Sequence, residues 1–247
     1  MIIDAHLHLR DDVYVGEEGS PENLVGLMDR AGVDKAVVFK IWCATGSSIE
    51  AGEQAAREYP DRLIPFVYVV PDFEKPVLPR LERALGGGVF RGLKIHTGAF
   101  RPVGYLVDPV LELAARHSVP CLVDFRGDLA SAERLAREFP AVRLIIAHLG
   151  KYLCNDEGLM DQFISLAEAH PNVFLDVSGV VMLWKIGDAV RRAGAGRVIW
   201  GTDGPRKPPD TLRFARMELD KVDALNLDPE AKQDLLGRNI ARLLSGP

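Results

Sequence analysis

Two histidines stand two residues apart near the start of the chain, in the segment DAHLH. Because side chains alternate along a strand, His6 and His8 point to the same side if this segment is a strand. Two imidazoles placed in this way can share one metal ion. A carboxylate, Asp203, follows a short apolar run near the other end of the chain, in VIWGTDGP. Together the three side chains form a ligand set suited to a metal site with an open position.

Five more polar side chains follow apolar runs in the same manner. Lys94 and His96 follow one run, Asp124 and Arg126 follow the next, and His148 follows a third. Each has a structural interpretation when taken alone. A lone histidine at a strand end is commonly a hydrogen-bonded structural residue, and Lys94 can form an ion pair with Asp124. Their collection at strand ends favours one shared site.

The apolar, β-branched runs that carry these side chains recur through the whole chain. They begin near residues 2, 35, 63, 91, 119, 143, 172 and 198, which is 24 to 33 residues apart. That spacing accommodates one strand and one helix, repeated eight times. It predicts an α/β fold, a single (β/α)8 TIM barrel domain over residues 1–247. The active site of such a barrel lies at the carboxyl ends of its strands, where the polar side chains fall.

The expected helices carry start signals. Serine or aspartate followed by proline occurs at residues 20–21, 108–109 and 228–229, which is typical of a helix N-terminus. Ser47 with Glu50 has the spacing of a capping box. The final segment, PEAKQDLLGRNIARLL, predicts an extra amphipathic helix at the C-terminal end of the barrel.

A doubly wound open sheet would alternate strands and helices in the same way. It usually shows G-x-G-x-x-G after the first strand, whereas this chain continues with HLHLRDD. The net charge of -5, with charged residues spread along the chain, argues against nucleic-acid binding. The barrel is therefore the better interpretation.

Cysteine content and apolar runs bear on the setting of the protein. The chain has three cysteines without C-x-x-C spacing, which argues against a disulfide framework and a thiolate zinc site. We see no signal-peptide pattern and no apolar run near the ~20 residues of a membrane span. These features favour a reducing cytoplasm and no membrane association.

The residues described above resemble the amidohydrolase superfamily. The similarity is greatest to the amidohydrolase-related branch that includes aminocarboxymuconate-semialdehyde decarboxylase and several lactonases. It extends over DAHLH, GLKIH, AHLG, GTDGP and GRNIARLL, nearly end to end. The H-x-H pair and the late aspartate, in this order and spacing, are the specific features.

The resemblance implies one divalent metal ion, usually zinc, held by His6, His8 and Asp203. In such enzymes a metal-activated water is the nucleophile. Asp203 would take its proton, and His148 would orient or polarise the substrate. Zinc chemistry agrees with this expectation, because the ion lowers the pKa of bound water to about 7.

The sequence departs from the family at Asp124, where the family usually has a metal-binding histidine. We expect Asp124 to replace that ligand, because a carboxylate oxygen binds zinc at a similar distance. An anionic ligand would favour a harder ion such as manganese. Two alternatives are a site that works without metal and a binuclear site bridged by carboxylated Lys94.

The basic residues near the predicted site indicate a small anionic substrate, with Lys94, His96 and Arg126 binding it. The leading function is metal-dependent hydrolysis of an anionic lactone, ester or amide. The alternatives are metal-dependent decarboxylation of an unsaturated acid and a non-catalytic ligand-binding barrel. The sequence leaves the substrate and any homo-oligomer unspecified.

Overall fold

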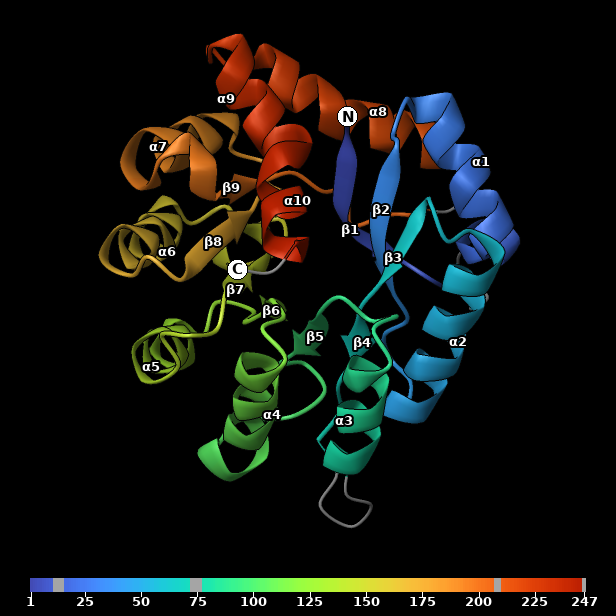
Figure 1. Ribbon diagram of the computed structural model, residues 1–247. Helices are drawn as coiled ribbons and strands as arrows, with labels where there is room; N and C mark the ends of the chain where they lie inside the picture. Colours follow the sequence, from blue (N-terminus) through green and yellow to red (C-terminus); the bar gives the residue numbers. More distant parts are fainter. Residues whose placement is uncertain (11–15, 72–76, 207–209, 246–247) are drawn as a thin grey trace.

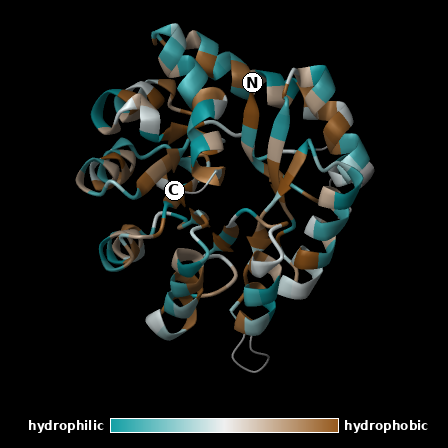
Figure 2. Ribbon diagram, in the orientation of Figure 1, coloured by the Kyte–Doolittle hydropathy of each residue, from teal (hydrophilic) through white to brown (hydrophobic). Residues whose placement is uncertain are grey.

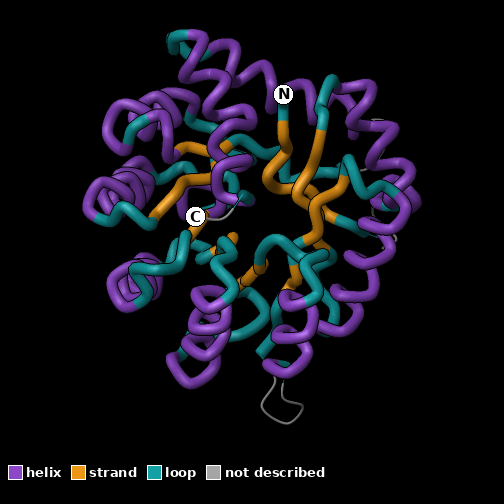
Figure 3. The backbone as a smooth tube through the Cα atoms, in the orientation of Figure 1, coloured by secondary structure: helices purple, strands orange, loops and turns teal. Residues whose placement is uncertain are grey.

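The computed structural model describes residues 1–10, 16–71, 77–206 and 210–245. Short strands lie at the centre and helices surround them (Figures 1 and 3). The strands are β1 (Ile3–His8), β2 (Lys35–Phe39), β3 (Leu63–Pro65), β4 (Val67–Tyr68), β5 (Leu93–His96), β6 (Cys121–Asp124), β7 (Leu144–Ile146), β8 (Val173–Asp176) and β9 (Val198–Ile199). Each begins within two residues of a predicted strand start, except β4, which continues β3.

The strands are parallel and pair in chain order, in two sheets, β1–β3 and β4–β9. One residue, Phe66, separates β3 from β4. The Phe66 amide donates to the Val38 carbonyl on β2, and the Val67 amide donates to the Gly92 carbonyl before β5. The segment 63–68 therefore acts as one strand that joins the two sheets.

Hydrogen bonds also join the first strand to the segment that follows the last one. The Ala5 amide donates to the Trp200 carbonyl at 3.2 Å, and the Asp203 amide donates to the His6 carbonyl at 2.7 Å. With both joins made, the strands form the ring of a TIM barrel, as the sequence predicts. The second join also brings Asp203 beside the histidines of β1.

The helices alternate with the strands and cover the outside of the ring (Figure 3). They are α1 (Pro21–Ala31), α2 (Thr45–Glu58), α3 (Leu78–Gly86), α4 (Gly104–Arg116), α5 (Leu129–Glu138), α6 (Glu157–Ala169), α7 (Leu183–Ala193), α8 (Asp210–Ala224), α9 (Pro229–Gln233) and α10 (Asn239–Leu244). The 3-10 turns are η1 (Gly16–Gly19), η2 (Ala147–Gly150) and η3 (Ala195–Arg197). Among the helices that the structure describes, none is long and apolar enough to cross a membrane.

Two of the three predicted serine- or aspartate-proline starts are confirmed. Ser20 caps α1 and Asp228 caps α9, each accepting a backbone amide. The start predicted at residues 108–109 is wrong, because α4 begins at Gly104 and Pro109 lies inside it. Asp108 instead accepts a hydrogen bond from the Arg134 guanidinium on α5, at 2.9 Å.

The predicted capping box at Ser47 and Glu50 is also wrong. Helix α2 begins earlier, at Thr45, and its first turn has no side-chain cap. The hydroxyls in this turn bind the chain that follows β3. Thr45 accepts the amide of Val70 and Ser48 accepts the amide of Tyr68. The turn therefore fixes a neighbouring strand.

The extra C-terminal helix is confirmed, with a π-helical turn (Asp234–Arg238) between α9 and α10. Helix α10 lies across the amino-terminal end of the barrel, near the chain's N-terminus (Figure 1). Its Ile240 and Leu243 pack with barrel-lining side chains that include Ile3 and Leu122. The helix closes this end of the barrel with apolar side chains.

Apolar residues concentrate in the strands and on the helix faces turned toward them (Figure 2). One buried cluster lies between the strands β4–β9 and the helices outside them, and a second fills the barrel around α10. This apolar filling supports the strands from both sides. The carboxyl ends of the strands are left as the end where polar groups gather.

Candidate active site

A cavity of about 640 Å³ opens at the carboxyl ends of the strands. Its walls come from β1, the loop after β2, β5, β6, the turn η2 and the segment after β9. All eight residues that the sequence singled out line it: His6, His8, Lys94, His96, Asp124, Arg126, His148 and Asp203. The topology thus brings every predicted site residue into one cavity.

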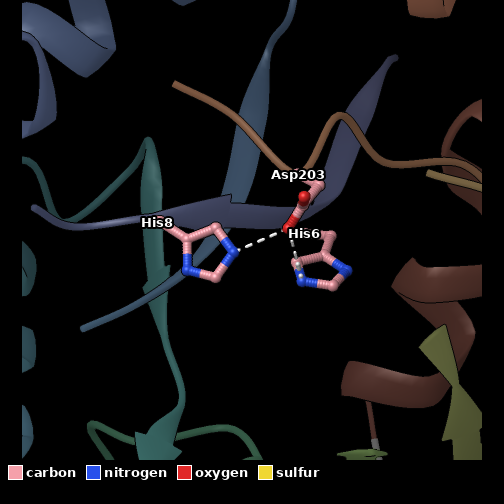
Figure 4. Close-up of side chains that lie close together, drawn as sticks. All are labelled: His6, His8 and Asp203. Carbon is pink, nitrogen blue, oxygen red and sulfur yellow. Dashed lines mark hydrogen bonds and ion pairs between the residues drawn. The ribbon is translucent and has the colours of Figure 1, made fainter. Parts of the chain in front are cut away.

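The two histidines of β1 and Asp203 form a compact group (Figure 4). Asp203 Oδ1 lies 2.8 Å from His8 Nε2 and 3.3 Å from His6 Nε2. Both histidines are buried, and Asp203 is mostly buried. Two ring nitrogens and one carboxylate oxygen therefore face the same point, as the alternation along β1 predicts.

Hydrogen bonds on the other side of the His6 ring fix which nitrogen carries the proton. Its Nδ1 lies 3.0 Å from Asp176 Oδ2, an acceptor, so Nδ1 is the donor. Nε2 then keeps its lone pair and accepts from Lys94 Nζ at 3.1 Å. Burial, followed by the charge of Lys94, keeps the pKa of His6 well below its ordinary value. The ring is therefore a neutral imidazole with Nε2 facing the group.

Asp203 is ionised at neutral pH. Burial opposes its charge, but the hydrogen bond from His8 and the neighbouring histidines outweigh it, and the pKa of Asp203 lies below its ordinary value. Its second oxygen, Oδ2, pairs with the Arg206 guanidinium at 3.0 Å. The carboxylate thus presents Oδ1 to the histidines and Oδ2 to a cation.

His148 follows β7 in a turn with an unusual backbone. Its φ of 60° and that of Leu149, 48°, lie in the left-handed region. His148 Nδ1 donates to the Ser178 carbonyl at 2.8 Å, so Nε2 is free of that proton and faces the cavity. The ring stacks on His6, with 4.9 Å between ring centroids. The turn therefore aims an imidazole nitrogen beside the histidine–aspartate group.

Asp124 pairs with His96. His96 Nδ1 accepts the Gly98 amide at 3.0 Å, so its Nε2 carries the proton and points at Asp124 Oδ2, 3.3 Å away. Asp124 Oδ2 is also 3.9 Å from His148 Nε2. Within the described residues, the ion pairs of Asp124 do not include Lys94, whose ammonium contacts His6. Lys94 and Asp124 therefore do not form the ion pair that the sequence left open as an alternative.

Cationic and aromatic side chains line the mouth of the cavity. Arg206 stacks between the rings of Tyr152 and Phe214, with 5.1 and 4.6 Å to the ring centroids. Trp42 lies over His96 at 4.6 Å between centroids and is 62% exposed. Further cations on the wall are Arg10, Arg126 and Lys151. The mouth is thus suited to a small anion.

The family model described as amidohydrolase matches residues 3–246. The chain belongs to the amidohydrolase family. A search of curated protein sequences found no match.

Solved structures agree with the family fold. The chain is similar to an amidohydrolase from Burkholderia multivorans with bound zinc, at 18% identity and a TM-score of 0.76, covering 100% of both chains. It is also similar to a probable 2-pyrone-4,6-dicarboxylic acid hydrolase from Acinetobacter baumannii, at 17% identity, a TM-score of 0.75 and 99% of both chains. A 5-carboxyvanillate decarboxylase from Sphingomonas paucimobilis matches at 14% identity and a TM-score of 0.72, over 100% of this chain and 99% of that one. These similar structures thus include a probable hydrolase and a decarboxylase.

The residues of this amidohydrolase fit a divalent metal ion. One ring nitrogen each of His6 and His8 and one oxygen of Asp203 all lie within 4.8 Å of one another. Nitrogen and carboxylate ligands are those that zinc takes in open catalytic sites. Burial lowers the pKa of Lys94, whose Nζ lies 3.1 Å from His6 Nε2. Asp124 lies outside this group of ligand atoms.

Two residues of the site were missed from the sequence, Asp176 and Ser178. Both are fully buried. Asp176 accepts from His6 Nδ1 and from the backbone amide of His148, and the Ser178 hydroxyl lies within hydrogen-bond distance of Nδ1 of both rings. Asp176 ends β8, so the rule that selected the other strand-end residues applies to it too. The segment NVFLDVSG carries that signal.

Proposed function

We propose that the protein is a metal-dependent hydrolase of a small anionic lactone, ester or amide. The observation that carries the proposal is the group formed by His6, His8 and Asp203 at the floor of a cationic cavity. A divalent ion held there would polarise a carbonyl group and lower the pKa of water. Zinc suits these ligands, and manganese becomes the better ion if Asp124 joins them.

The side chains of the cavity divide the remaining work. Asp203 is ionised at neutral pH and sits at the floor, so it is our candidate for the group that takes a proton from the attacking water. His148 presents Nε2 to the same space and is our candidate for orienting the substrate carbonyl.

The anionic part of the substrate would bind at the cationic mouth. Arg126 is exposed at the end of β6 and has a guanidinium that can hold a carboxylate by two bonds. Lys94 and His96, on β5, also line the cavity. Arg206 pairs with Oδ2 of Asp203, the oxygen that does not face the histidines, and adds a second cation.

Metal content of the purified protein, measured before any chelator is used, tests the proposal. We expect about one divalent ion per chain. A His6→Ala, His8→Ala double variant that keeps its circular dichroism spectrum should lose the ion. Unchanged stoichiometry in that variant would show that these histidines do not hold it.

Decarboxylation of an unsaturated acid is the second candidate, because the similar structures include a decarboxylase. Both reactions use the same residues here, so product analysis separates them. A panel of anionic lactones, esters, amides and unsaturated acids should be incubated with the metal-loaded protein. Mass spectrometry then distinguishes addition of water from loss of carbon dioxide.

A further inference from the structure

Asp176 collects hydrogen bonds from three separate elements. Its Oδ2 accepts from the Ser178 hydroxyl at 2.6 Å, from His6 Nδ1 at 3.0 Å and from the His148 amide at 3.2 Å. Its Oδ1 accepts the Ser178 amide at 3.2 Å. The carboxylate is 0% exposed, so these donors take the place of water. One buried anion thus ties the end of β8 to β1 and to the turn after β7.

The same atoms also have the spacing of a second metal site, because ligand atoms of His6, His148 and Asp176 lie within 4.8 Å of one another. The hydrogen bonds decide against that interpretation. His148 Nδ1 lies 2.8 Å from the Ser178 carbonyl, which only accepts, so this nitrogen carries a proton. A protonated nitrogen has no lone pair for a metal. The cluster is therefore a hydrogen-bonding centre.

The Ser178 hydroxyl completes this centre. Its proton goes to Asp176, the closest acceptor, so its oxygen is left to accept. Both ring donors lie within reach, His148 Nδ1 at 3.0 Å and His6 Nδ1 at 3.2 Å. Every contact in the cluster therefore favours a proton on Nδ1 in both rings.

We propose that Asp176, together with Ser178, is a positioning residue that sets the proton positions and orientations of His6 and His148 simultaneously. This inference rests on the proposed function, which gives His6 to the metal and His148 to the substrate. With both protons held at Nδ1, both Nε2 atoms face the cavity. A carboxylate behind a ligating histidine also makes the ligand more basic, and losing such a partner typically costs about 10–100-fold in metal affinity.

Asp176 also restrains the backbone that carries His148. A non-glycine residue at φ 60° is uncommon and persists only where its surroundings hold it. The bond from the His148 amide to Asp176 Oδ2 is one such restraint. The carboxylate therefore acts on His148 twice, through the backbone and, by way of Ser178, through the ring.

The proton positions can be measured without metal or substrate. Two-dimensional NMR of the metal-free protein labelled with 15N-histidine distinguishes Nδ1–H from Nε2–H rings, and single His→Gln variants assign the signals. We expect His6 and His148 both to carry the proton on Nδ1, and His96 to carry it on Nε2. A wild-type protein in which either His6 or His148 carries its proton on Nε2 overturns the inference, whatever the variants show.

Metal affinity provides the second measurement. Asp176→Asn keeps the size of the side chain and removes its charge. We expect it to weaken zinc binding by about 10–100-fold in a chelator competition assay. Asp108→Asn is the control, because Asp108 is a carboxylate that pairs with Arg134 on α5 and lies outside the cavity. It should bind zinc within about threefold of wild type.

Zinc affinity that is unchanged in folded Asp176→Asn overturns the inference. An equal loss in Asp108→Asn also overturns it, because the effect would then not depend on the contacts of Asp176. If wild-type protein binds no metal, the proposed function fails, and the NMR result still decides the proton positions. If Asp176→Asn does not fold, the NMR spectrum of the wild-type protein still tests the inference.

Discussion

Asp203 directs its two oxygens to different partners, Oδ1 to the two histidines and Oδ2 to Arg206. Asp203→Asn keeps this shape but provides a much weaker proton acceptor. We expect kcat to fall by about 10²–10⁴-fold at saturating metal, with KM within a few-fold of wild type. Steady-state kinetics with a substrate from the panel checks this, with metal content measured in parallel. A kcat within a few-fold of wild type would remove Asp203 from the role of base.

Arg126 follows β6 and Arg206 follows β9, and both line the cavity, so variants of each can separate their roles. Replacing Arg126 by Met should raise KM for an active carboxylate substrate by at least about tenfold, because a charge-assisted bidentate contact is lost. The neutral methyl ester of the same substrate should change far less. Arg206→Met is the companion variant, and it should also reduce kcat because Arg206 pairs with Asp203. Equal effects of Arg126→Met on acid and ester would contradict the assignment.

Asp124 is the residue whose type departs from the family and whose role the sequence left open between metal ligand and ion-pair partner. The structure gives it a different partner, the Nε2–H of His96. We therefore expect Asp124→Ala to change metal affinity less than threefold and to raise KM. Zinc competition and steady-state kinetics measure the two effects. A loss of metal affinity of tenfold or more would make Asp124 a ligand, as first expected.

At the level of single residues, sequence reasoning located the site and left its internal bonds undetermined. All eight selected residues line one cavity because strand ends converge in a parallel barrel. The partners of Lys94 and Asp124 depend on side-chain directions within a few ångströms, which spacing in the sequence does not encode. Asp176 also ends a strand, but its partners His6 and His148 come from other parts of the barrel, and the segment around Asp176 does not indicate them.

Among the elements, the turn η2 gives the sharpest test of how local structure supports the site. Gly150 in this turn has a φ of 101°, and a Cβ there would lie 2.1 Å from the Phe163 ring on α6. Gly150→Ala should therefore lower the free energy of unfolding by about 2 kcal/mol or more, and it should disturb His148 in the same turn. Urea denaturation measures the stability, and kcat reports the displacement of His148.

Gly187→Ala is the matched control for that substitution. Gly187 lies inside α7, and a Cβ there would meet no atom within 4 Å. The change should raise stability by about 0.5–1 kcal/mol, because alanine is the better helix former. Similar losses in both variants would mean that the conformation of η2 is not what Gly150 secures.

The elements themselves followed from the sequence, and their boundaries followed only in part. The strand starts could be predicted because every buried strand needs an apolar run, whatever its neighbours are. Helix starts depend on what the polar side chains bind in the folded protein. Asp108 pairs with Arg134, and Ser48 holds the amide of Tyr68, so neither acts as the predicted helix signal. At both places the side chain makes a tertiary contact and does not cap the predicted helix start.

The whole molecule divides along the barrel axis into an apolar end and a polar end. Helix α10 closes the amino-terminal end with Ile240 and Leu243, while histidines, carboxylates and arginines occupy the other. This division places several histidines in surroundings that disfavour their charged form. Burial lowers the pKa of His6 and of His8, and burial lowers the pKa of His96 to about 4. The metal-free protein should therefore lose stability in mild acid.

The direction of this pH dependence follows from the protons that the folded and the unfolded chain bind. Between pH 6.5 and about 4, unfolded chains hold a proton on His96 that the folded protein does not, so stability is full above pH 6.5 and is lost as pH falls toward 4. Because this ring is partly exposed, we expect about 1 kcal/mol from His96 between pH 7 and pH 5. Urea unfolding of metal-free protein at the two pH values gives the difference. His96→Gln should reduce that difference by this amount, whereas His170→Gln, at the end of α6 and outside the cavity, should leave it unchanged. A pH dependence that is identical in wild type and His96→Gln would show that this ring does not contribute to acid lability.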